Sequence, residues 1–202
     1  MKGRICANGA PHQKFVPKEE AEFLTITLEG ILVTMMIDAY EYRKVENFGI
    51  PAAYLQTDLP TEKFTLLLME GNFMDIMCDI NPNYKKHVKL KTGRKNWYLR
   101  ILKAIYGMIK CALLWYELYM SVLKNMLFRL NPYGMCVANN DINGKHCTIA
   151  WYVDDNKVSH VEQNVTDDLI SKVEERSLGL TVTKGNVYIL LGMKKGTSII
   201  GG

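Results

Sequence analysis

The stretch Ile149-Ala150-Trp151-Tyr152-Val153-Asp154-Asp155 decides the fold of this 202-residue chain. Its first five residues are apolar or aromatic, which favours a β-strand, and two adjacent carboxylates follow at once. A second strand-forming run covers residues 157–161. We therefore predict a β-hairpin with Asp154 and Asp155 at its tip.

The sequence before this hairpin predicts another one, because Asn143-Gly144 is a strong signal for a tight hairpin turn. Apolar residues at helical spacing predict two long helices, at 28–42 with Thr27 as N-cap and at 112–130. The other predicted elements are strands at 48–54 and 64–69, a helix at 73–80, two strands within 87–102, a helix at 166–176 with Asp167 and Asp168 in its first turn, and a last hairpin of strands 180–183 and 187–191.

This order of elements alternates helices with antiparallel strand pairs, which favours the α+β class. We expect one antiparallel sheet that holds residues 48–50, 147–153 and 157–161. The two long helices are expected to cover its far face, so that helices lie on one face of the sheet only.

The composition is that of an ordinary globular chain. Apolar residues make up 48% of it, enough for a core. The five cysteines are scattered without a Cys-x-x-Cys pair, as reduced thiols are, and the four histidines do not lie at zinc-site spacing. The sequence has no apolar run typical of a membrane span or a signal peptide. We therefore expect an intracellular protein, cytoplasmic or nuclear, that is not secreted and has no membrane partner.

The two adjacent carboxylates carry the clearest chemical signal. They repel each other, and each raises the pKa of the other unless a cation neutralises them. Mg²⁺ suits such a site because it prefers oxygen ligands. Nucleotidyl transfer uses two metal ions about 3.5–4 Å apart, and these ions need carboxylates from more than one strand. The alternative is that Asp154-Asp155 is an ordinary hairpin turn, in which Asp is common.

Positive charge is concentrated in one stretch. Residues 82–116 contain nine Lys or Arg and no Asp or Glu, whereas the formal net charge of the whole chain is only +4. Such blocks commonly contact phosphate groups, and the alternative is a basic hairpin that is simply solvated. The candidate nucleic-acid-binding residues are Lys89, Lys91, Arg94, Lys95 and Lys110.

Tyr152-Val153-Asp154-Asp155 resembles the catalytic hairpin of reverse transcriptases, and further segments resemble the copia-type retrotransposon family in order and spacing. Phe48-Gly49-Ile50-Pro51-Ala52-Ala53-Tyr54-Leu55 is similar to the first catalytic motif of that family. The other similar segments are Lys2-Gly3-Arg4-Ile5-Cys6-Ala7-Asn8-Gly9 in the fingers, Ile105-Tyr106-Gly107-Met108 with Trp115-Tyr116, and Leu191-Gly192-Met193 near the palm–thumb boundary.

The resemblance implies a right-hand polymerase palm with partial fingers, and RNA-directed DNA polymerisation with two Mg²⁺ ions as the ancestral activity. Its substrates would be deoxynucleotides and an RNA or DNA template–primer, and its partners other segments of a retrotransposon polyprotein. Asp154 and Asp155 match the metal-binding aspartates. Tyr54 matches the ring beneath the incoming sugar that excludes a 2′-hydroxyl, and Tyr152 belongs to the same nucleotide site. Without the resemblance, Tyr54 would be interpreted as a core aromatic.

The family pattern also implies how the chain is divided. Residues 1–202 would form one reverse transcriptase domain, with partial fingers and the first helix in 1–47 and the palm in 48–195. A finger insertion is expected around 60–104. The thumb, ribonuclease H and integrase are expected to be absent, as in a degenerate and truncated copy.

One catalytic position departs from the family. Gly49 stands where the first catalytic aspartate is expected, and it has no side chain to bind a metal. Glu46 and Asp58 are the nearest acids, and neither is an obvious substitute. If the motif assignment holds, the Cα atoms of Gly49 and Asp154 must lie within about 10 Å of each other, because neighbouring strands are about 4.8 Å apart.

Three functional hypotheses remain open. The first is a polymerase domain by descent that is catalytically silent, and the second is a polymerase that keeps weak activity through Asp154 and Asp155. The third is a non-catalytic nucleic-acid-binding module that uses the basic block from Lys85 to Lys110. Gly49 separates the first two, and salt-dependent binding without magnesium dependence would favour the third.

Overall fold

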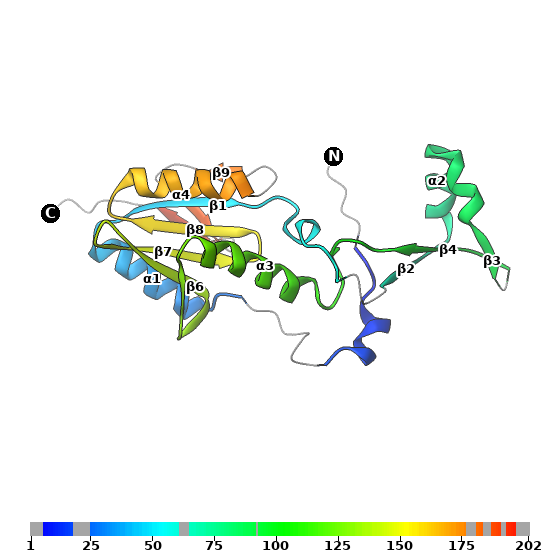
Figure 1. Cartoon of the computed structure of the whole chain (residues 1–202), viewed down its shortest axis with the longest axis horizontal. Helices are drawn as coiled ribbons and strands as arrows, with labels where there is room; N and C mark the ends of the chain where they lie inside the picture. The colour runs from blue at the N-terminus through cyan, green and yellow to red at the C-terminus, as the bar shows by residue number, and fades with distance from the viewer. Residues whose placement is uncertain are drawn as a thin grey trace.

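The computed structural model describes residues 6–17, 25–60, 65–91, 93–176, 181–183, 187–190 and 193–196. These residues form an α+β protein with a main body and a smaller lobe that stands apart from it (Figure 1). The main body holds one antiparallel sheet with helices against it, and the smaller lobe holds a three-stranded antiparallel sheet. The α+β class is therefore confirmed. Within the described residues, no helix is long and apolar enough to cross a membrane.

The main sheet has the strand order β5-β6-β7-β8-β1, and a short further strand, β9, pairs with the other edge of β1. Its strands are β1 (Lys44–Gly49), β5 (Arg129–Asn131), β6 (Gly134–Ile142), β7 (Lys145–Tyr152), β8 (Asp155–His160) and β9 (Thr181–Thr183). The helices against it are α1 (Leu28–Tyr40), α3 (Cys111–Asn125) and α4 (Gln163–Arg176).

Two predicted local features of the main body are confirmed. Asn143 and Gly144 have φ values of +54° and +70°, the signs that a type I′ turn requires at both central positions. They join β6 to β7, and a second two-residue loop joins β7 to β8. Thr27 caps α1 as predicted, because its hydroxyl accepts a hydrogen bond from the N–H of Gly30 at 3.1 Å.

Helices cover both faces of the main sheet, which corrects the expectation that both long helices lie on one face. Neighbouring side chains of a strand point to opposite faces. Trp151 of β7 packs against Tyr119 of α3, with ring centroids 5.5 Å apart. Lys157 of β8 is paired in the ladder with Ala150, the neighbour of Trp151, and forms an ion pair with Asp38 of α1. A lysine in the middle of the sheet needs a buried carboxylate, and α1 supplies it from the other face.

The fourth α-helix, α4, lies on the same face as α3. It begins at Gln163, three residues before the predicted start, so Asp167 and Asp168 lie beyond its first turn and that expectation is wrong. Asp168 instead forms an i,i+4 ion pair with Lys172 at 2.6 Å. The core between these two helices and the sheet includes Phe48, Leu123, Ile149, Trp151, Val158, Leu169 and Val173.

The helix α3 ends five residues before the predicted residue 130. Leu127 has φ +67°, a left-handed conformation that stops the helix. The N–H of Leu127 donates to the carbonyl of Lys124 at 2.9 Å, and that of Phe128 donates to the carbonyl of Leu123 at 3.0 Å. This is the Schellman arrangement of a helix end. The apolar pattern of the sequence continues beyond the helix end because Phe128, after the left-handed residue, is again buried in the core. This is why the helix was predicted to run on to residue 130.

Two strand predictions also need correction. The predicted strand 48–54 is β1, which starts four residues earlier and ends at Gly49; a short 3-10 helix, η3 (Ala53–Gln56), follows. The predicted last hairpin is wrong, because β9 pairs with β1 while β10 (Val187–Leu190) pairs with β11 (Met193–Gly196). The edge of β1 that does not pair with β8 is available to another strand, and the local sequence around β9 does not reveal that it pairs there. The turn predicted for that hairpin, at residues 184–186, lies outside the described residues.

The smaller lobe confirms the other predicted elements. Its sheet has the order β2-β4-β3, and one face of it is covered by α2 and the 3-10 helix η4. On that face Trp97 packs against the rings of Tyr84, at 5.0 Å, and His87, at 6.1 Å. The elements of this lobe are β2 (Leu66–Glu70), α2 (Asn72–Ile80), η4 (Pro82–His87), β3 (Lys89–Lys91) and β4 (Arg94–Arg100).

Candidate active site

The candidate catalytic carboxylates lie on the loop between β7 and β8. Tyr152 and Asp155 face each other as the last pair of the ladder, and Val153 and Asp154 form the loop. Val153 has φ +56°, the sign that a type II′ turn needs at its first loop position. A β-branched residue with positive φ is a genuine outlier, and strain of this kind concentrates at functional sites.

Hydrogen bonds from three elements hold this loop. The indole Nε1 of Trp115, on α3, donates to the carbonyl of Val153 at 2.8 Å. The side-chain amide of Asn156, on β8, donates to the carbonyl of Asp154 at 2.9 Å. The backbone N–H of Ile50, just after β1, donates to the same carbonyl at 2.9 Å. The loop is therefore fixed in place by the body of the protein.

Gly49, the last residue of β1, lies directly opposite Asp155 of β8. Opposed residues of an antiparallel pair have Cα atoms about 4.5–5.5 Å apart, and consecutive Cα atoms are about 3.8 Å apart. Gly49 and Asp154 thus lie within the 10 Å limit that the motif assignment requires. A side chain at position 49 would project from the same face of the sheet as that of Asp155.

The nearest acids in sequence do not replace the missing carboxylate. Glu46 lies on the other face of β1, where the side-chain amide of Gln163 donates to it at 2.6 Å. Asp58 forms an ion pair with Lys103 at 2.9 Å. Within the part of the chain that the structure describes, no group of three His, Cys, Asp or Glu side chains could hold a metal. The residues present therefore do not fit the two-ion set of nucleotidyl transfer.

The electrostatics of the carboxylate pair are unfavourable on their own. Partial burial raises the pKa of Asp155, and the adjacent Asp154 raises that pKa further. Both effects disfavour the charged form of the second carboxylate. A positive charge placed beside Asp155 would oppose both effects and favour its ionised form.

Tyr54 lies beside the same loop, on η3. Its side chain is only 6% exposed, and its ring centroid is 4.8 Å from that of Tyr106. The pKa of Tyr54 is raised to about 12, mainly by burial and then by Cys111, Tyr106, Asp154 and Tyr152. These neighbours come from two segments, 106–111 and 152–154, that are far from Tyr54 and from each other in sequence. Tyr54 is thus both a core aromatic and a neighbour of the aspartate loop, so the two interpretations of it are compatible.

The segment that resembles the fingers and the segment around Tyr106 lie in backbone contact. The N–H of Ala7 donates to the carbonyl of Tyr106 at 2.7 Å. Gly107 has φ +86°, and a Cβ on it would lie 2.0 Å from the carbonyl oxygen of Ala7. A Cβ on Gly9 would lie 2.4 Å from the carbonyl oxygen of Gly107. Only glycine at both positions allows the two backbones to approach so closely.

A buried ion pair near the site is one that sequence reasoning missed. Asp38 and Lys157 each expose only 3% of their side chains, and Lys157 also donates to the hydroxyl of Thr34 at 2.9 Å. Lys157 follows Asp155 by two residues, so both side chains leave the same face of β8. The sequence signals for this pair were Lys157 inside an apolar strand and Asp38 inside an apolar helix. Neither signal indicates which residue is the partner.

The strand β4 separates the candidate nucleic-acid-binding residues. Lys95 points to the covered face of the small sheet, where its ammonium contacts the carboxylate of Asp75 on α2 at 2.5 Å. Lys110 lies in the main body as the N-cap residue of α3. The structure brings the remaining three candidates together on the opposite face of the small sheet: Lys89, Lys91 and Arg94.

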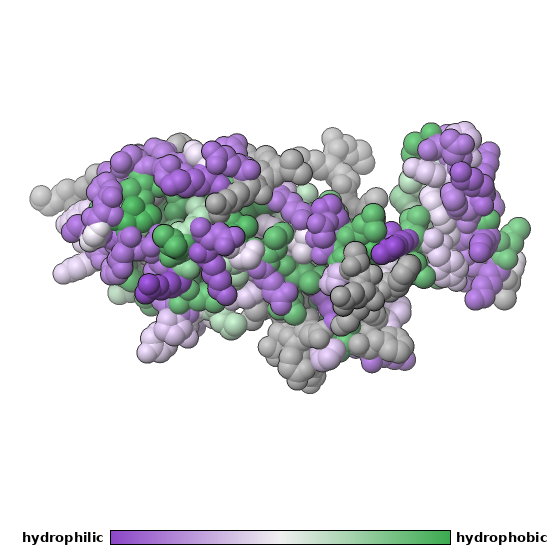
Figure 2. Space-filling model, in the orientation of Figure 1, coloured by the Kyte–Doolittle hydropathy of each residue, from purple (hydrophilic) through white to green (hydrophobic). Residues whose placement is uncertain are grey.

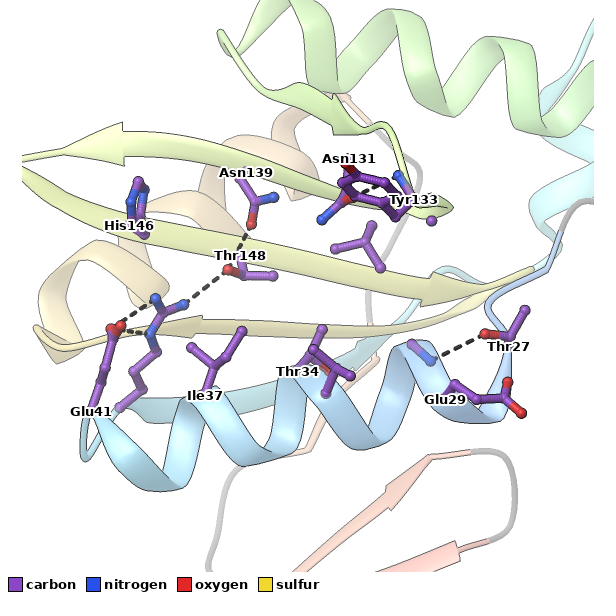
Figure 3. Close-up of a pocket in the computed structure, with 15 residues that line it drawn as sticks. Thr27, Glu29, Thr34, Ile37, Glu41, Asn131, Tyr133, Asn139, His146 and Thr148 are labelled. Atoms are coloured by element: carbon purple, nitrogen blue, oxygen red, sulfur yellow. Dashed lines mark hydrogen bonds and ion pairs between the residues drawn. The ribbon is translucent and has the colours of Figure 1, made fainter.

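A cavity of about 510 Å³ lies between α1 and the strands β6 and β7 (Figure 3). The guanidinium of Arg43 donates to the carboxylate of Glu41 at 2.8 Å and to the hydroxyl of Thr148 at 2.9 Å. The hydroxyl of Thr148 donates in turn to Asn139 at 2.8 Å. The charge of Arg43 is thus neutralised within the protein. None of the candidate site residues named from the sequence is among those that line this cavity.

Comparison with known proteins identifies no relative: no family model matches the chain, and no curated protein matches it. Of the segments that carry the resemblance, residues 2–5 and 191–192 lie outside the described residues. The function must therefore be inferred from the geometry of the residues that the structure does describe.

Proposed function

We propose that this chain is the palm, with part of the fingers, of a copia-type reverse transcriptase whose polymerase site is silent. The observation that supports this most is the convergence of separate motifs. Gly49 of the first motif is opposite Asp155, and Tyr54 of the same motif packs against Tyr106 and lines a small cavity together with Val153 of the loop. Motif residues about 50 to 100 positions apart in sequence would not meet at one loop if each match were accidental.

The silence of the site follows from position 49. Two-metal phosphoryl transfer depends almost wholly on positioning and charge neutralisation. Loss of a carboxylate that bridges both ions removes several kcal/mol of transition-state stabilisation, and each 1.4 kcal/mol is about tenfold in rate. Glu46 and Asp58 have other partners and do not face the loop. We therefore expect no templated synthesis, which favours the silent polymerase over a weakly active one.

In this proposal the residues that would contact the incoming nucleotide are retained, although the metal-binding set is incomplete. Tyr54 takes the role of the ring beneath the incoming sugar, and its tilted contact with Tyr106 supports it from behind. A rigid aromatic in that place leaves no room for a 2′-hydroxyl. Tyr152, at the end of β7, is 37% exposed and borders the same site.

The division of the chain into fingers and palm stays a proposal as well. The main sheet with α3 and α4 would be the palm, although its strand β1 begins at Lys44, four residues before the expected span of 48–195. The smaller lobe, from β2 to β4, would be the finger insertion expected around 60–104. It leaves the main body beside the bridge between Asp58 and Lys103.

A second candidate function is a non-catalytic nucleic-acid-binding module. The observation that favours it is the face of the small sheet opposite α2, where Lys89, Lys91 and Arg94 lie together. This candidate does not need the aspartate loop. It also predicts binding that depends on salt and not on magnesium.

The experiment that tests the main proposal is primer extension on an RNA template, with magnesium and then with manganese. The native chain, Asp154→Asn and Gly49→Asp are compared at equal concentration. We expect the native chain to give no extension above the Asp154→Asn background. Extension by the native chain that Asp154→Asn abolishes would show that another acid performs the role of position 49.

A further inference from the structure

We propose that the face of the β2-β4-β3 sheet opposite α2 and η4 is a platform for single-stranded nucleic acid. This inference deepens the second candidate function, because it names the ligand class and the residues that select it. It does not depend on the polymerase site. The platform is defined here as the outward residues of β4 and the residues paired with them, with Tyr98 at its centre.

The strand registers arrange the platform in rows. Arg100 pairs with Leu66, and Tyr98 pairs with Leu68. The next row holds Asn96 between Glu70 and Lys89, and the last row pairs Arg94 with Lys91. Residues that alternate along β4 share one face, and six residues of a strand span about 20 Å. The platform thus has cations at both ends and an aromatic–aliphatic row between them.

The aromatic and aliphatic side chains of the platform are accessible, whereas Asn96 in the next row is buried at 5% exposure. Tyr98 is 46% exposed, Leu68 is 44% exposed and Leu66 is 55% exposed. Apolar rings in such a position are normally covered, as Trp97 is on the reverse face of the same strand at 7% exposure. Figure 2 shows hydrophobic residues interspersed with hydrophilic ones on this smaller lobe. The surface therefore offers an open aromatic face within reach of positive charge.

Charge indicates the class of occupant. The platform carries four cations, Lys89, Lys91, Arg94 and Arg100, against one acid, Glu70, and two of the four, Lys91 and Arg100, also have interactions within the protein. Lysine and arginine are well suited to contact backbone phosphates, and such contacts carry no sequence information. A polyanion with exposed flat rings complements both halves of the surface. Single-stranded DNA or RNA has this chemistry, because its unpaired bases stack on aromatic side chains while its phosphates meet the cations.

A duplex complements the same surface less well. Its bases are stacked inside the helix and present no ring face to Tyr98, so it can use the cations only. The structure therefore favours unpaired over paired nucleic acid.

The same strand provides a matched control. Arg94 and Lys95 are adjacent, and each carries one positive charge. Arg94 lies on the platform, whereas Lys95 lies on the reverse face against Asp75 of α2. Replacing either residue with Ala changes the net charge equally. A difference between the two variants therefore reports the face of the sheet and not the total charge.

The test is fluorescence anisotropy of a labelled oligo(dT) 12-mer and a 12-base-pair duplex with the full chain, at several salt concentrations. We expect tighter binding of the single strand. Tyr98→Ala should weaken it about 5- to 100-fold, as loss of one stacked base does, and Tyr98→Phe should restore it. Duplex binding should not respond to Tyr98→Ala. Arg94→Ala should lower the salt slope by about 0.7, while Lys95→Ala leaves it unchanged.

Each other outcome has a definite meaning. Equal binding of both oligonucleotides, with no effect of Tyr98→Ala, overturns the single-strand platform and leaves nucleic-acid binding itself standing. Binding of neither oligonucleotide at low salt overturns the platform and the second candidate function together. Adsorption to anionic vesicles without oligonucleotide binding does the same. None of these results bears on the polymerase proposal, which primer extension tests separately.

Discussion

Gly49 of β1 and Asp155 of β8 are directly opposed in the central ladder of the sheet. The backbone N–H of the next residue, Ile50, donates to the carbonyl of Asp154, so the end of β1 is tied to the aspartate loop itself. The scaffold that would present a third carboxylate is therefore in place, and only its side chain is missing.

The contact between the Ala7 and Gly107 backbones should not tolerate a side chain. In Gly107→Ala the new Cβ would lie 2.0 Å from the carbonyl oxygen of Ala7, in addition to the positive φ. The control is Gly144→Ala, which has a similar φ of +70° but open space around the new Cβ. We expect the control to cost about 1–2 kcal/mol and Gly107→Ala to cost more. Urea unfolding of both variants measures this, and equal losses would contradict the close contact.

The end of α3 should become more stable with glycine. Leu127 is 75% exposed and has φ +67°, so it buries little surface and adopts a conformation that glycine takes without strain. We expect Leu127→Gly to raise the free energy of unfolding by about 1 kcal/mol. Leu127→Ala keeps the Cβ and should give no such gain. A loss of stability in Leu127→Gly would show that its side chain has a packing role.

The buried ion pair should respond differently to single and double replacement. Lys157→Met leaves the carboxylate of Asp38 buried without its cation, which costs about 3–5 kcal/mol. The double variant Asp38→Leu, Lys157→Met should recover most of this loss, because apolar pairs often replace buried ion pairs without harm. Lys172→Met is the exposed control and should cost less than about 1 kcal/mol. Additive losses in the double variant would contradict a direct pair.

The aspartate loop should show a pH-dependent gain from removal of one charge. The folded protein raises the pKa of Asp155 above its ordinary value of 3.8, so ionisation of this group opposes folding. Asp155→Asn should therefore stabilise the chain at pH 7, and the gain should disappear as the pH falls through 3.8, where Asp155 is protonated in both states. Urea midpoints at pH 7 and pH 3 measure the difference. A destabilised variant at pH 7 would mean that a cation already compensates Asp155.

Local pattern predicted most of the elements and the centre of the candidate site. The Asn143-Gly144 corner, the Thr27 cap and the aspartate hairpin all depend on residues close in sequence, and all are confirmed. The tip of the aspartate hairpin is Val153-Asp154, one residue earlier than predicted, because Asp155 already pairs with Tyr152. The proximity of Gly49 to the loop is long-range, and the motif resemblance predicted it before the register showed it.

The errors come from contacts that local pattern does not contain. The position of α1 depends on the partnership of Asp38 with Lys157, which are 119 residues apart. The end of α3 depends on a left-handed Leu127, a residue that gives no signal for a helix end. The split of the basic block arises because Arg94 and Lys95 alternate across one strand, so charge density alone could not place them.

The central claim is that one missing carboxylate separates this site from a metal-binding polymerase site. The most direct measurement is the melting temperature with and without Mg²⁺ for the native chain, Gly49→Asp, and Gly49→Asp with Asp154→Asn. At a magnesium concentration ten times the dissociation constant, binding adds about 1.4 kcal/mol, or about 3–6 °C for a domain of this size. The account predicts this shift in Gly49→Asp alone. A magnesium shift in the native chain, or none in Gly49→Asp, would contradict it.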